Sequence, residues 1–428
     1  RACQQIASGR TASVPHACQH AHGQVETVGM RADRPVQLGV RLTIIIEYDL
    51  EIIGALRHRA ERIDQRARIV AIKRNEDGKP GFANQKSGCI RMLTHRDFGH
   101  RIHAHTPAGR ASPERLFPAE VEIHAGLDGL TALATLPEAD VVLCAVVGVT
   151  GLEPSLAAIE AGKDLALASK EILVRAGKFV MAAAREKGIA LRPVDSEHNA
   201  VYQCLADNPT KDIARIVLTA SGGAFRNRSL AKLAEVTPAD AWQHPNWSMG
   251  PKITVYSSAM ANKGLELIVA RWLFDLQPDQ CQAVLHRGSL AHCIVEFTDG
   301  AMLTHLCPPS MTFPIQHALL HPLRLPPVDP PLDLREPFSL DFEPIDQQSF
   351  PLLGLAIDSL RTGATAPAAY NAANEIAVEA FLNERMPFLE IPRIVEQTLE
   401  QMDHRDPTVL SAVISHDAEA RRLAHSLI

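Results

Sequence analysis

Residues 141–147 read Val-Val-Leu-Cys-Ala-Val-Val, a continuous apolar run typical of a strand that is buried on both faces of a sheet. Gly148 and Gly151 predict a turn after this strand, and Pro154 lies near the start of the helix that follows. A second apolar segment, residues 165–168, predicts the next strand. Strands that alternate with helices in this way indicate a parallel sheet with right-handed crossover connections.

Ser169, Lys170 and Glu171 follow the second strand and open a helix predicted over residues 169–186. Ligands of parallel sheets bind beyond the carboxyl ends of the strands. A lysine in the first turn of a helix opposes the helix dipole, and its presence is better explained if it meets an anion. An ordinary surface lysine is the alternative for Lys170.

Residues 193–200 read Pro-Val-Asp-Ser-Glu-His-Asn-Ala and follow a short apolar run, residues 189–191, that predicts another strand. On an extended backbone, Asp195 and Glu197 would point to the same side. Two carboxylates directed at one point repel each other unless a cation lies between them, and oxygen ligands suit Mg²⁺ or Mn²⁺. The alternative is a solvated strand end that carries two surface acids.

Two further segments are candidates for binding a ligand. Residues 215–220 predict a strand that ends in Ser221-Gly222-Gly223, and such small residues allow backbone N–H groups to approach a phosphate. A plain turn is the alternative. Residues 244–252 read His-Pro-Asn-Trp-Ser-Met-Gly-Pro-Lys and predict a lid that excludes water from a reaction. Here the alternative is a structural loop whose tryptophan is anchored in the core.

A short strand is expected at residues 253–255, followed by the sequence Ser-Ser-Ala-Met-Ala-Asn-Lys-Gly-Leu-Glu at 257–266. Apolar residues at helical spacing predict a helix that begins within this segment. Asn262 and Lys263 would lie at the helix start, where anions bind well, so this segment could hold a phosphorylated sugar. Glu266 could complete the metal site, although an ordinary acidic first turn is the alternative.

The last part of the chain predicts a sheet, a linker and a set of helices. Residues 290–306 alternate between apolar and polar, which predicts strands with one buried face. The proline-rich segment 325–331 predicts a stiff linker, and residues 391–402 keep helical periodicity. Asn371 and Asn374 are interpreted as packing or helix-capping residues.

Composition limits the class of protein. The chain has 428 residues, 46% of them hydrophobic and 21% charged, as expected for a globular protein of two or three domains. A net charge of −6 and a pI near 6.4 argue against nucleic-acid and membrane partners. Eight cysteines without a C-x-x-C pair indicate neither a zinc site nor a disulfide framework, and favour a reducing cytoplasm. We expect no signal peptide and no membrane span, and the first residue, Arg1, is compatible with a fragment.

The first 120 residues differ in composition from the rest. Residues 43–46 and 67–72 predict short strands, and residues 50–63 have a helical apolar stripe. The run His-Ala-Cys-Gln-His-Ala-His at 16–22 allows a metal-binding tract, for which no further partner is suitably spaced. No glycine-rich phosphate loop occurs here. The segment is interpreted either as a divergent domain or as sequence that did not evolve as one.

Four motifs taken together closely resemble 1-deoxy-D-xylulose 5-phosphate reductoisomerases. They are Pro-Val-Asp-Ser-Glu-His-Asn-Ala, Ser-Gly-Gly-x-Phe-Arg, His-Pro-Asn-Trp-Ser-Met-Gly and Asn-Lys-Gly-Leu-Glu, and the resemblance extends from about residue 121 to the C-terminus. That family converts 1-deoxy-D-xylulose 5-phosphate to 2-C-methyl-D-erythritol 4-phosphate in non-mevalonate isoprenoid biosynthesis. The resemblance implies NADPH and Mn²⁺, Mg²⁺ or Co²⁺ as cofactors, a sugar phosphate as substrate, and a cytoplasmic homodimer.

The resemblance also assigns roles to single residues. It implies that the metal ligands are Asp195, Glu197 and Glu266. Residues expected to contact the substrate are Lys170, Ser196, Glu197, Ser221, His244, Ser257, Asn262, Lys263 and Glu266. The expected catalytic residues are Lys170, Glu197, His244 and the flap residue Trp247. Residues expected on the cofactor side are Ser169, Glu171 and Gly250.

The chain departs from the family pattern at three places. The G-x-T-G-x-x-G loop of the family is absent from residues 1–120, Tyr256 replaces an acid beside a substrate serine, and Ser169 replaces an asparagine. Two alternatives to the reductoisomerase therefore stay open. One is a non-catalytic remnant that binds sugar phosphate and metal without a working NADPH site, and the other is a metal-dependent isomerase that performs no reduction.

These observations predict an α/β fold with several domains. We expect a Rossmann-like parallel-sheet N-terminal domain whose first half is aberrant, an α+β catalytic domain and a C-terminal helical bundle. The expected divisions are an unmatched segment over 1–120, the remainder of the NADPH-binding domain over 121–193, a catalytic and dimerisation domain over 194–324, a linker over 325–350 and a helical domain over 351–428.

Overall fold

The computed structural model describes residues 42–47, 67–72, 126–146, 148–206, 210–226, 228, 230–241, 251–346 and 348–428. All of them belong to one unit, Gln37–Ile428. The helix predicted over 50–63 and the histidine run at 16–22 lie outside the described residues.

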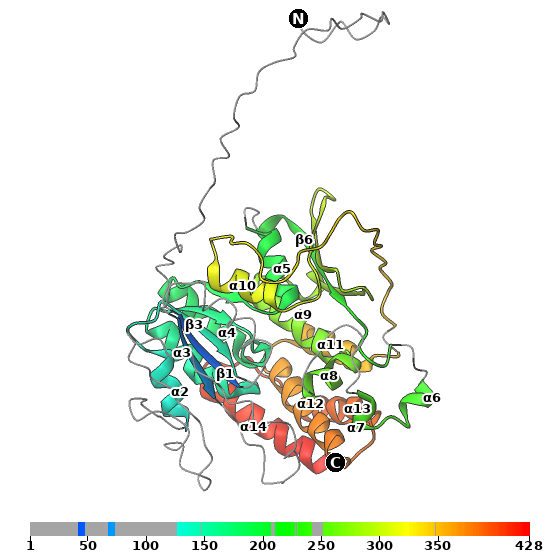
Figure 1. Cartoon of the computed structure of the whole chain (residues 1–428). Helices are drawn as coiled ribbons and strands as arrows, with labels where there is room; N and C mark the ends of the chain where they lie inside the picture. Colours follow the sequence, from blue (N-terminus) through cyan, green and yellow to red (C-terminus); the bar gives the residue numbers. More distant parts are fainter. Residues whose placement is uncertain are drawn as a thin grey trace, which may run out of the picture. The chain divides into compact units, whose positions relative to one another are not determined.

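A five-stranded parallel sheet forms the first layer (Figure 1). Its strands are β1 (Leu42–Glu47), β2 (Ala67–Ile72), β3 (Val141–Ala145), β4 (Asp164–Leu167) and β5 (Leu191–Pro193), in the order β2-β1-β3-β4-β5. The strands predicted at 43–46 and 67–72 are thus confirmed. Because β1 pairs with β2 on one side and with β3 on the other, the sheet has a topological switch point between β1 and β3.

Helices connect these strands as the sequence predicts. The connecting elements are α2 (Gly126–Ala134), the short 3₁₀ helix η2 (Gly148–Gly151), α3 (Leu152–Glu160) and α4 (Lys170–Lys187). Strand β3 is buried along nearly its whole length, as expected for a strand covered on both faces. The carboxyl ends of β3, β4 and β5 therefore place the starts of η2, α4 and the next helix along one edge of the sheet.

A second sheet has four strands in the order β7-β6-β8-β9. They are β6 (Ile213–Ala220), β7 (Cys281–Leu285), β8 (Ala291–Phe297) and β9 (Met302–Leu306). Strand β6 is parallel to β7 and antiparallel to β8, which in turn pairs antiparallel with β9. Helix α5 (Ser196–Cys204) packs against β8 and β9. The predicted buried face is confirmed for β8, whereas β9 is largely exposed.

Two local predictions are wrong. Residues 253–255 are not a strand but part of helix α8 (Pro251–Ser258), which begins with a proline, a residue whose fixed φ suits the first helical position. The β-branched run in this segment favoured a strand, and the helical context overrides that propensity. Likewise, Asp195 and Glu197 do not lie on an extended strand. Strand β5 ends at Pro193, and Asp195 caps α5 by accepting a hydrogen bond from the backbone N–H of His198 at 3.4 Å.

Helices form the C-terminal layer. They are α11 (Pro351–Thr362), α12 (Ala366–Leu382), α13 (Glu390–Gln401) and α14 (Leu410–Leu427). Helix α12 packs against α13, α14 and α4, which joins the bundle to the parallel sheet (Figure 1). Asn371 and Asn374 are fully buried inside α12, so they are packing residues and not caps.

The remaining elements complete the expected fold class. They are η3 (Thr210–Asp212), α6 (Leu230–Leu233), α7 (Pro238–Ala241), α9 (Ala261–Leu273), η4 (Pro278–Gln280) and α10 (Thr312–Leu320). The α/β fold with a helical C-terminal bundle is confirmed, while the boundaries between domains stay predictions. Within the described part of the chain, no helix has both the length and the apolar character required to cross a membrane.

Candidate active site

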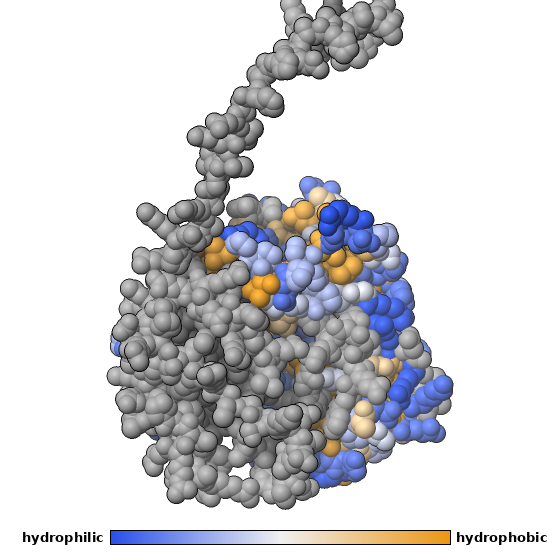
Figure 2. All heavy atoms as spheres, in the orientation of Figure 1, coloured by the Kyte–Doolittle hydropathy of each residue, from blue (hydrophilic) through white to orange (hydrophobic). Residues whose placement is uncertain are grey.

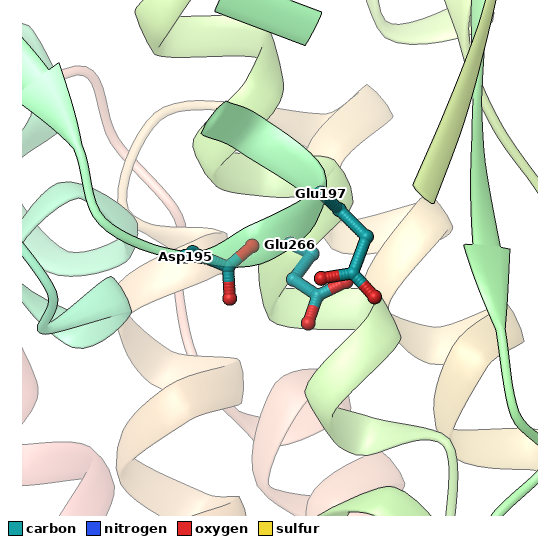
Figure 3. Close-up of side chains that lie close together, drawn as sticks. All are labelled: Asp195, Glu197 and Glu266. Carbon is teal, nitrogen blue, oxygen red and sulfur yellow. The ribbon is translucent and has the colours of Figure 1, made fainter. Parts of the chain in front are cut away.

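Three carboxylates from two helix starts meet at one point. Asp195 caps α5, Glu197 lies in the first turn of α5, and Glu266 lies in the second turn of α9. One oxygen atom of each carboxylate lies within 4.8 Å of the other two (Figure 3). The site arises because β5 ends just before α5, and α5 packs against α9. The sequence-predicted metal ligands are therefore brought together.

Two lysines form ion pairs with these carboxylates and offset their negative charge. The Nζ atom of Lys170 lies 2.5 Å from Oδ2 of Asp195 and 3.3 Å from Oε1 of Glu266. The Nζ atom of Lys263 lies 2.9 Å from Oε1 of Glu197 and also forms an ion pair with Glu266. Lys170 thus meets anions at the start of α4, as its position opposite the helix dipole led us to expect. The surface-lysine alternative does not hold for this residue, which is largely buried.

Burial and neighbouring charges give the three carboxyl groups different pKa values. Burial raises the pKa of Glu266 to about 7, and the nearby charge of Glu197 acts in the same direction. Burial would also raise the pKa of Asp195, but Lys170 and His198 outweigh it and hold that pKa well below its usual range. Burial opposes ionisation of Glu197 as well, yet Lys263 lowers its pKa. Oxygen donors held this close fit a hard divalent cation.

His198 contacts the carboxylate cluster, and the sequence reasoning did not assign it a role. Its ring is 1% exposed, with Nδ1 at 2.8 Å from Oδ1 of Asp195 and Nε2 at 2.8 Å from the backbone carbonyl oxygen of Glu266. Both neighbours are acceptors, so this geometry favours the protonated ring, in which both nitrogens donate. Burial lowers the pKa of His198, but Asp195 outweighs this effect and the pKa is raised. The signal was present in the motif, since His198 stands three residues after the capping aspartate.

Two residues that we expect to contact the substrate are hydrogen-bonded to the carboxylates. The hydroxyl of Ser196 donates to Oε2 of Glu197 at 2.6 Å, and Nδ2 of Asn262 donates to Oε1 of Glu266 at 2.6 Å. Both residues lie in the first turn of a helix. They therefore border the carboxylate cluster and could reorient toward a ligand that enters it.

The expected phosphate contacts come from two different elements that approach closely. Ser221 follows β6, and its hydroxyl accepts a hydrogen bond from the N–H of Gly223 at 3.3 Å. Gly223 has a φ of +66°, and a Cβ atom added there would lie 2.6 Å from the carbonyl oxygen of Ser257. A glycine is therefore required where the turn after β6 meets the end of α8, and this contact brings Ser221 and Ser257 to the same region.

The cofactor side of the site lies along the carboxyl edge of the parallel sheet. The hydroxyl of Ser169 donates to the backbone carbonyl of Val146, so the ends of β3 and β4 are linked. Glu171 lies in the first turn of α4, and Gly148, three residues after the end of β3, has a φ of +71° at the start of η2. Tyr256 is buried nearby, and burial together with the charges of Glu375 and Glu171 raises its pKa.

Three predicted site residues, His244, Trp247 and Gly250, lie outside the described residues. Their assignments to substrate, flap and cofactor stay predictions.

Family models match three parts of the chain. A 1-deoxy-D-xylulose 5-phosphate reductoisomerase model matches residues 106–177, and the C-terminal domain models of the same enzyme match residues 191–274 and 306–423. The first match begins before residue 121, where the sequence resemblance was expected to start. The matched segments contain both helix starts that carry the carboxylates.

Curated relatives of the chain are named after the same enzyme as the family models. A 1-deoxy-D-xylulose 5-phosphate reductoisomerase from Heliobacterium modesticaldum is 49% identical over 304 residues, which covers 71% of this chain and 78% of the relative. The enzyme of that name from Geobacter metallireducens is 48% identical over 307 residues, covering 72% and 80%.

Solved structures agree with this likeness. The reductoisomerase from Zymomonas mobilis in complex with NADPH superimposes with a TM-score of 0.76 at 36% identity, covering 91% of this chain and 99% of that chain. A reductoisomerase in complex with NADPH, fosmidomycin and magnesium gives a TM-score of 0.77 at 34% identity, with 91% and 98% covered.

Proposed function

Since the chain belongs to the 1-deoxy-D-xylulose 5-phosphate reductoisomerase family, we propose that it converts 1-deoxy-D-xylulose 5-phosphate to 2-C-methyl-D-erythritol 4-phosphate for isoprenoid biosynthesis. The reaction combines a rearrangement of the carbon skeleton with a reduction by NADPH. The observation that carries the proposal is the cluster of Asp195, Glu197 and Glu266 with two buried lysines at the carboxyl edge of the parallel sheet. The matches to named reductoisomerases do not support the alternative of a non-catalytic remnant.

A divalent cation, Mg²⁺, Mn²⁺ or Co²⁺, would be held by Asp195, Glu197 and Glu266. Three carboxylate oxygens from a preformed cluster are a suitable donor set for such an ion, and a similar structure contains magnesium. When bound, the cation supplies Lewis acidity toward the oxygen atoms of the substrate. His198 keeps the capping aspartate and the α9 backbone in register, because its ring contacts both.

The substrate would lie between the carboxylates and the turn after β6. Asn262 and Lys263 are in the first turn of α9, where backbone N–H groups favour the phosphate, and Ser221 and Ser257 border the same region. Lys170 carries a positive charge close to two of the carboxylates. It would stabilise negative charge on the oxygen atoms at the reacting end of the substrate. His244 and Trp247 are proposed to close over the substrate and exclude water.

NADPH would bind along the carboxyl edge of the parallel sheet. The switch point between β1 and β3 is the usual place for a dinucleotide in such a sheet, and Gly148, in the left-handed region, lies three residues after the end of β3. Ser169, Glu171 and Gly250 are the proposed contacts. The nicotinamide could then reach the substrate from the Lys170 side, because Lys170 begins the helix that follows β4. This position supports reduction over an isomerase that uses no reductant.

We also propose a homodimer. Strand β9 lies at an edge of its sheet, with Met302, Leu303 and Leu306 exposed by 59%, 43% and 37%. Figure 2 shows apolar surface in orange on the upper part of the molecule, where Figure 1 places α10 and the four-stranded sheet. An edge strand with exposed apolar side chains is a suitable surface for a second copy. The absence of a C-x-x-C pair supports the predicted cytoplasmic location, which stays a prediction.

The proposed function is tested by following NADPH oxidation with 1-deoxy-D-xylulose 5-phosphate and Mg²⁺. We expect turnover that needs all three components, and mass spectrometry should identify the methylerythritol phosphate. Consumption of the substrate without oxidation of NADPH would instead favour an isomerase. Absence of any turnover, with NADPH and Mg²⁺ bound, would contradict the proposal. The dimer is tested separately by sedimentation, where Leu303→Glu should shift the protein toward the monomer.

A further inference from the structure

Two cysteines that are 89 residues apart in the sequence lie side by side behind the carboxylate cluster. Cys204 is the last residue of α5, and Cys293 lies in the middle of β8. Their Sγ atoms are 3.9 Å apart, and neither cysteine forms a disulfide bond. Two other cysteines, Cys144 and Cys281, instead contact backbone carbonyl oxygens. The contact between thiols of different elements is therefore a feature of this pair, and it has no part in the proposed reaction.

The two thiols differ in access and in acidity. Cys293 is fully buried, whereas Cys204 is only partly buried. A hydrogen bond from Cys293 lowers the pKa of Cys204, while the same bond and burial raise the pKa of Cys293. Reactive cysteines are those that are reachable and deprotonate readily. Cys204 thus has the properties of a thiol that reacts first with an oxidant. Cys293 has those of a buried thiol that reacts afterwards with the modified Cys204.

The position of the pair connects it to the carboxylates. Helix α5 has nine residues, begins beside Asp195 and Glu197, and ends with Cys204. Strand β8 is hydrogen-bonded to β6 and to β9, and the hydroxyl of Thr304 donates to the carbonyl oxygen of Cys293 at 2.7 Å. The strand is therefore held on both sides. If the two sulfur atoms approach each other, α5 is the element that moves.

We propose that Cys204 and Cys293 form an oxidisable pair that accepts one disulfide from a low-molecular-weight disulfide such as glutathione disulfide. The Cys204 thiolate attacks one sulfur of the oxidant, a mixed disulfide forms, and one thiolate leaves. The Cys293 sulfur then attacks the Cys204 sulfur, its proton passes to the second departing thiolate, and the internal disulfide closes. The two protein thiols lose two electrons and two protons, and the oxidant is reduced to two thiols.

Closure of the disulfide shortens the distance between the Sγ atoms by about 2 Å, since a disulfide bond is about 2 Å long. A shift of this size along α5 displaces both carboxylates at its start. Misplacement of a reacting group by about 1 Å can cost on the order of a hundredfold in rate. The oxidised protein should therefore need at least about tenfold more Mg²⁺ for half-maximal activity. This second step rests on the proposed function, whereas formation of the disulfide does not.

The disulfide is tested on the full chain by treatment with glutathione disulfide, alkylation and peptide mass spectrometry. We expect a linked peptide that joins Cys204 to Cys293 and disappears after reduction. Cys293→Ser should retain a stable glutathione adduct on Cys204, and Cys204→Ser should give neither the adduct nor the link. Cys281→Ser, a variant of a buried cysteine elsewhere, should behave like the unmodified sequence. Absence of the linked peptide, or no adduct on Cys204 in Cys293→Ser, would overturn the pair.

The effect on the site is tested by titrating Mg²⁺ into reduced and oxidised protein. We expect weaker binding and lower activity after oxidation, full recovery after reduction, and no response to the oxidant in Cys204→Ser. Equal Mg²⁺ affinity and activity in the two states would overturn the switch. If the reduced protein has no reductoisomerase activity, the proposed function fails, while Mg²⁺ binding measured by calorimetry and the linked peptide still decide the inference.

Discussion

The two halves of the candidate active site are built in different ways. On the metal side, charged side chains meet in a buried cluster, with Lys263 and Glu266 only 3% and 1% exposed. On the cofactor side, the carboxyl edge of the parallel sheet presents backbone turns, and Gly148 with its φ of +71° is the clearest example. This difference indicates that ligand binding on the metal side depends on the identity of a few ionisable groups, whereas ligand binding on the cofactor side depends on the conformation of the backbone. The two halves should therefore respond to substitution in different ways.

The largest effect is expected on the metal side, from Glu266→Gln. Glutamine keeps the size of the side chain but removes a charged ligand, so kcat/KM should fall on the order of a thousandfold, which corresponds to about 4 kcal/mol. The variant should still fold, because the raised pKa of Glu266, about 7, indicates that the neutral form is tolerated there. Rates of NADPH oxidation and calorimetric titration of Mg²⁺ measure the effect.

Glu379→Gln, an exposed position on α12, is the matched control and should retain full activity. A loss of less than about tenfold in Glu266→Gln would mean that the carboxylate cluster is not the metal site.

A smaller effect on the same side is expected from His198→Gln. The histidine ring bridges the Asp195 carboxylate and the Glu266 backbone. Glutamine has no rigid ring with a donor on each side, so it cannot contact both acceptors at once. Loss of a group that orients a ligand typically costs about 10- to 100-fold in metal affinity. The Mg²⁺ concentration for half-maximal activity should rise accordingly, while the KM for NADPH stays unchanged. His425→Gln on the exposed face of α14 should leave both values as they are.

The same comparison explains which parts could be predicted from the sequence. Asp195 and Glu197 of the metal side were singled out because two carboxylates stand two residues apart, and the family resemblance added Glu266 as the third ligand. The backbone around Asp195 was nevertheless expected to be extended, and it is instead a helix cap. The wrong expectation and the missed His198 have one cause. A capping aspartate accepts from the N–H three residues later, which brings the side chain of His198 to the carboxylate.

The cofactor side was less accessible to sequence reasoning. The strands at 43–46 and 67–72 were predicted from their apolar residues, but their order in the sheet comes from pairing with β3, which no local pattern specifies. Residues 253–255 show the same limit, because a β-branched run predicted a strand where packing gives a helix. Strand order and local backbone conformation that depend on contacts with distant parts of the chain cannot be predicted from the residue pattern of one segment.

On the cofactor side, Gly148→Ala should act through the backbone. An alanine is disfavoured by about 1–2 kcal/mol in the left-handed region. Its Cβ atom would also lie 3.3 Å from Oε1 of Glu375. We expect the turn after β3 to shift and the dissociation constant for NADPH, measured by fluorescence titration, to rise about tenfold.

Gly162→Ala is the matched control, because Gly162 has nearly the same φ of +72° and a Cβ atom there meets nothing within 4 Å. Both variants should lose similar stability, and only Gly148→Ala should lose NADPH affinity. Equal affinity in the two variants would show that the turn after β3 does not shape the cofactor site.

The smallest effect is expected from Ser169→Ala, which separates side-chain from backbone contributions on the cofactor side. The hydroxyl of Ser169 is engaged by the carbonyl of Val146, so its loss should lower the free energy of unfolding by about 1 kcal/mol. The KM for NADPH should change less than about threefold, since we expect Ser169 to contact the nucleotide through its backbone, which the variant retains. Ser426→Ala removes a similar hydroxyl-to-carbonyl bond at an exposed position and should cost less stability. A large loss of NADPH affinity in Ser169→Ala would mean that this hydroxyl contacts the nucleotide directly, and the distinction between a side-chain half and a backbone half would fail.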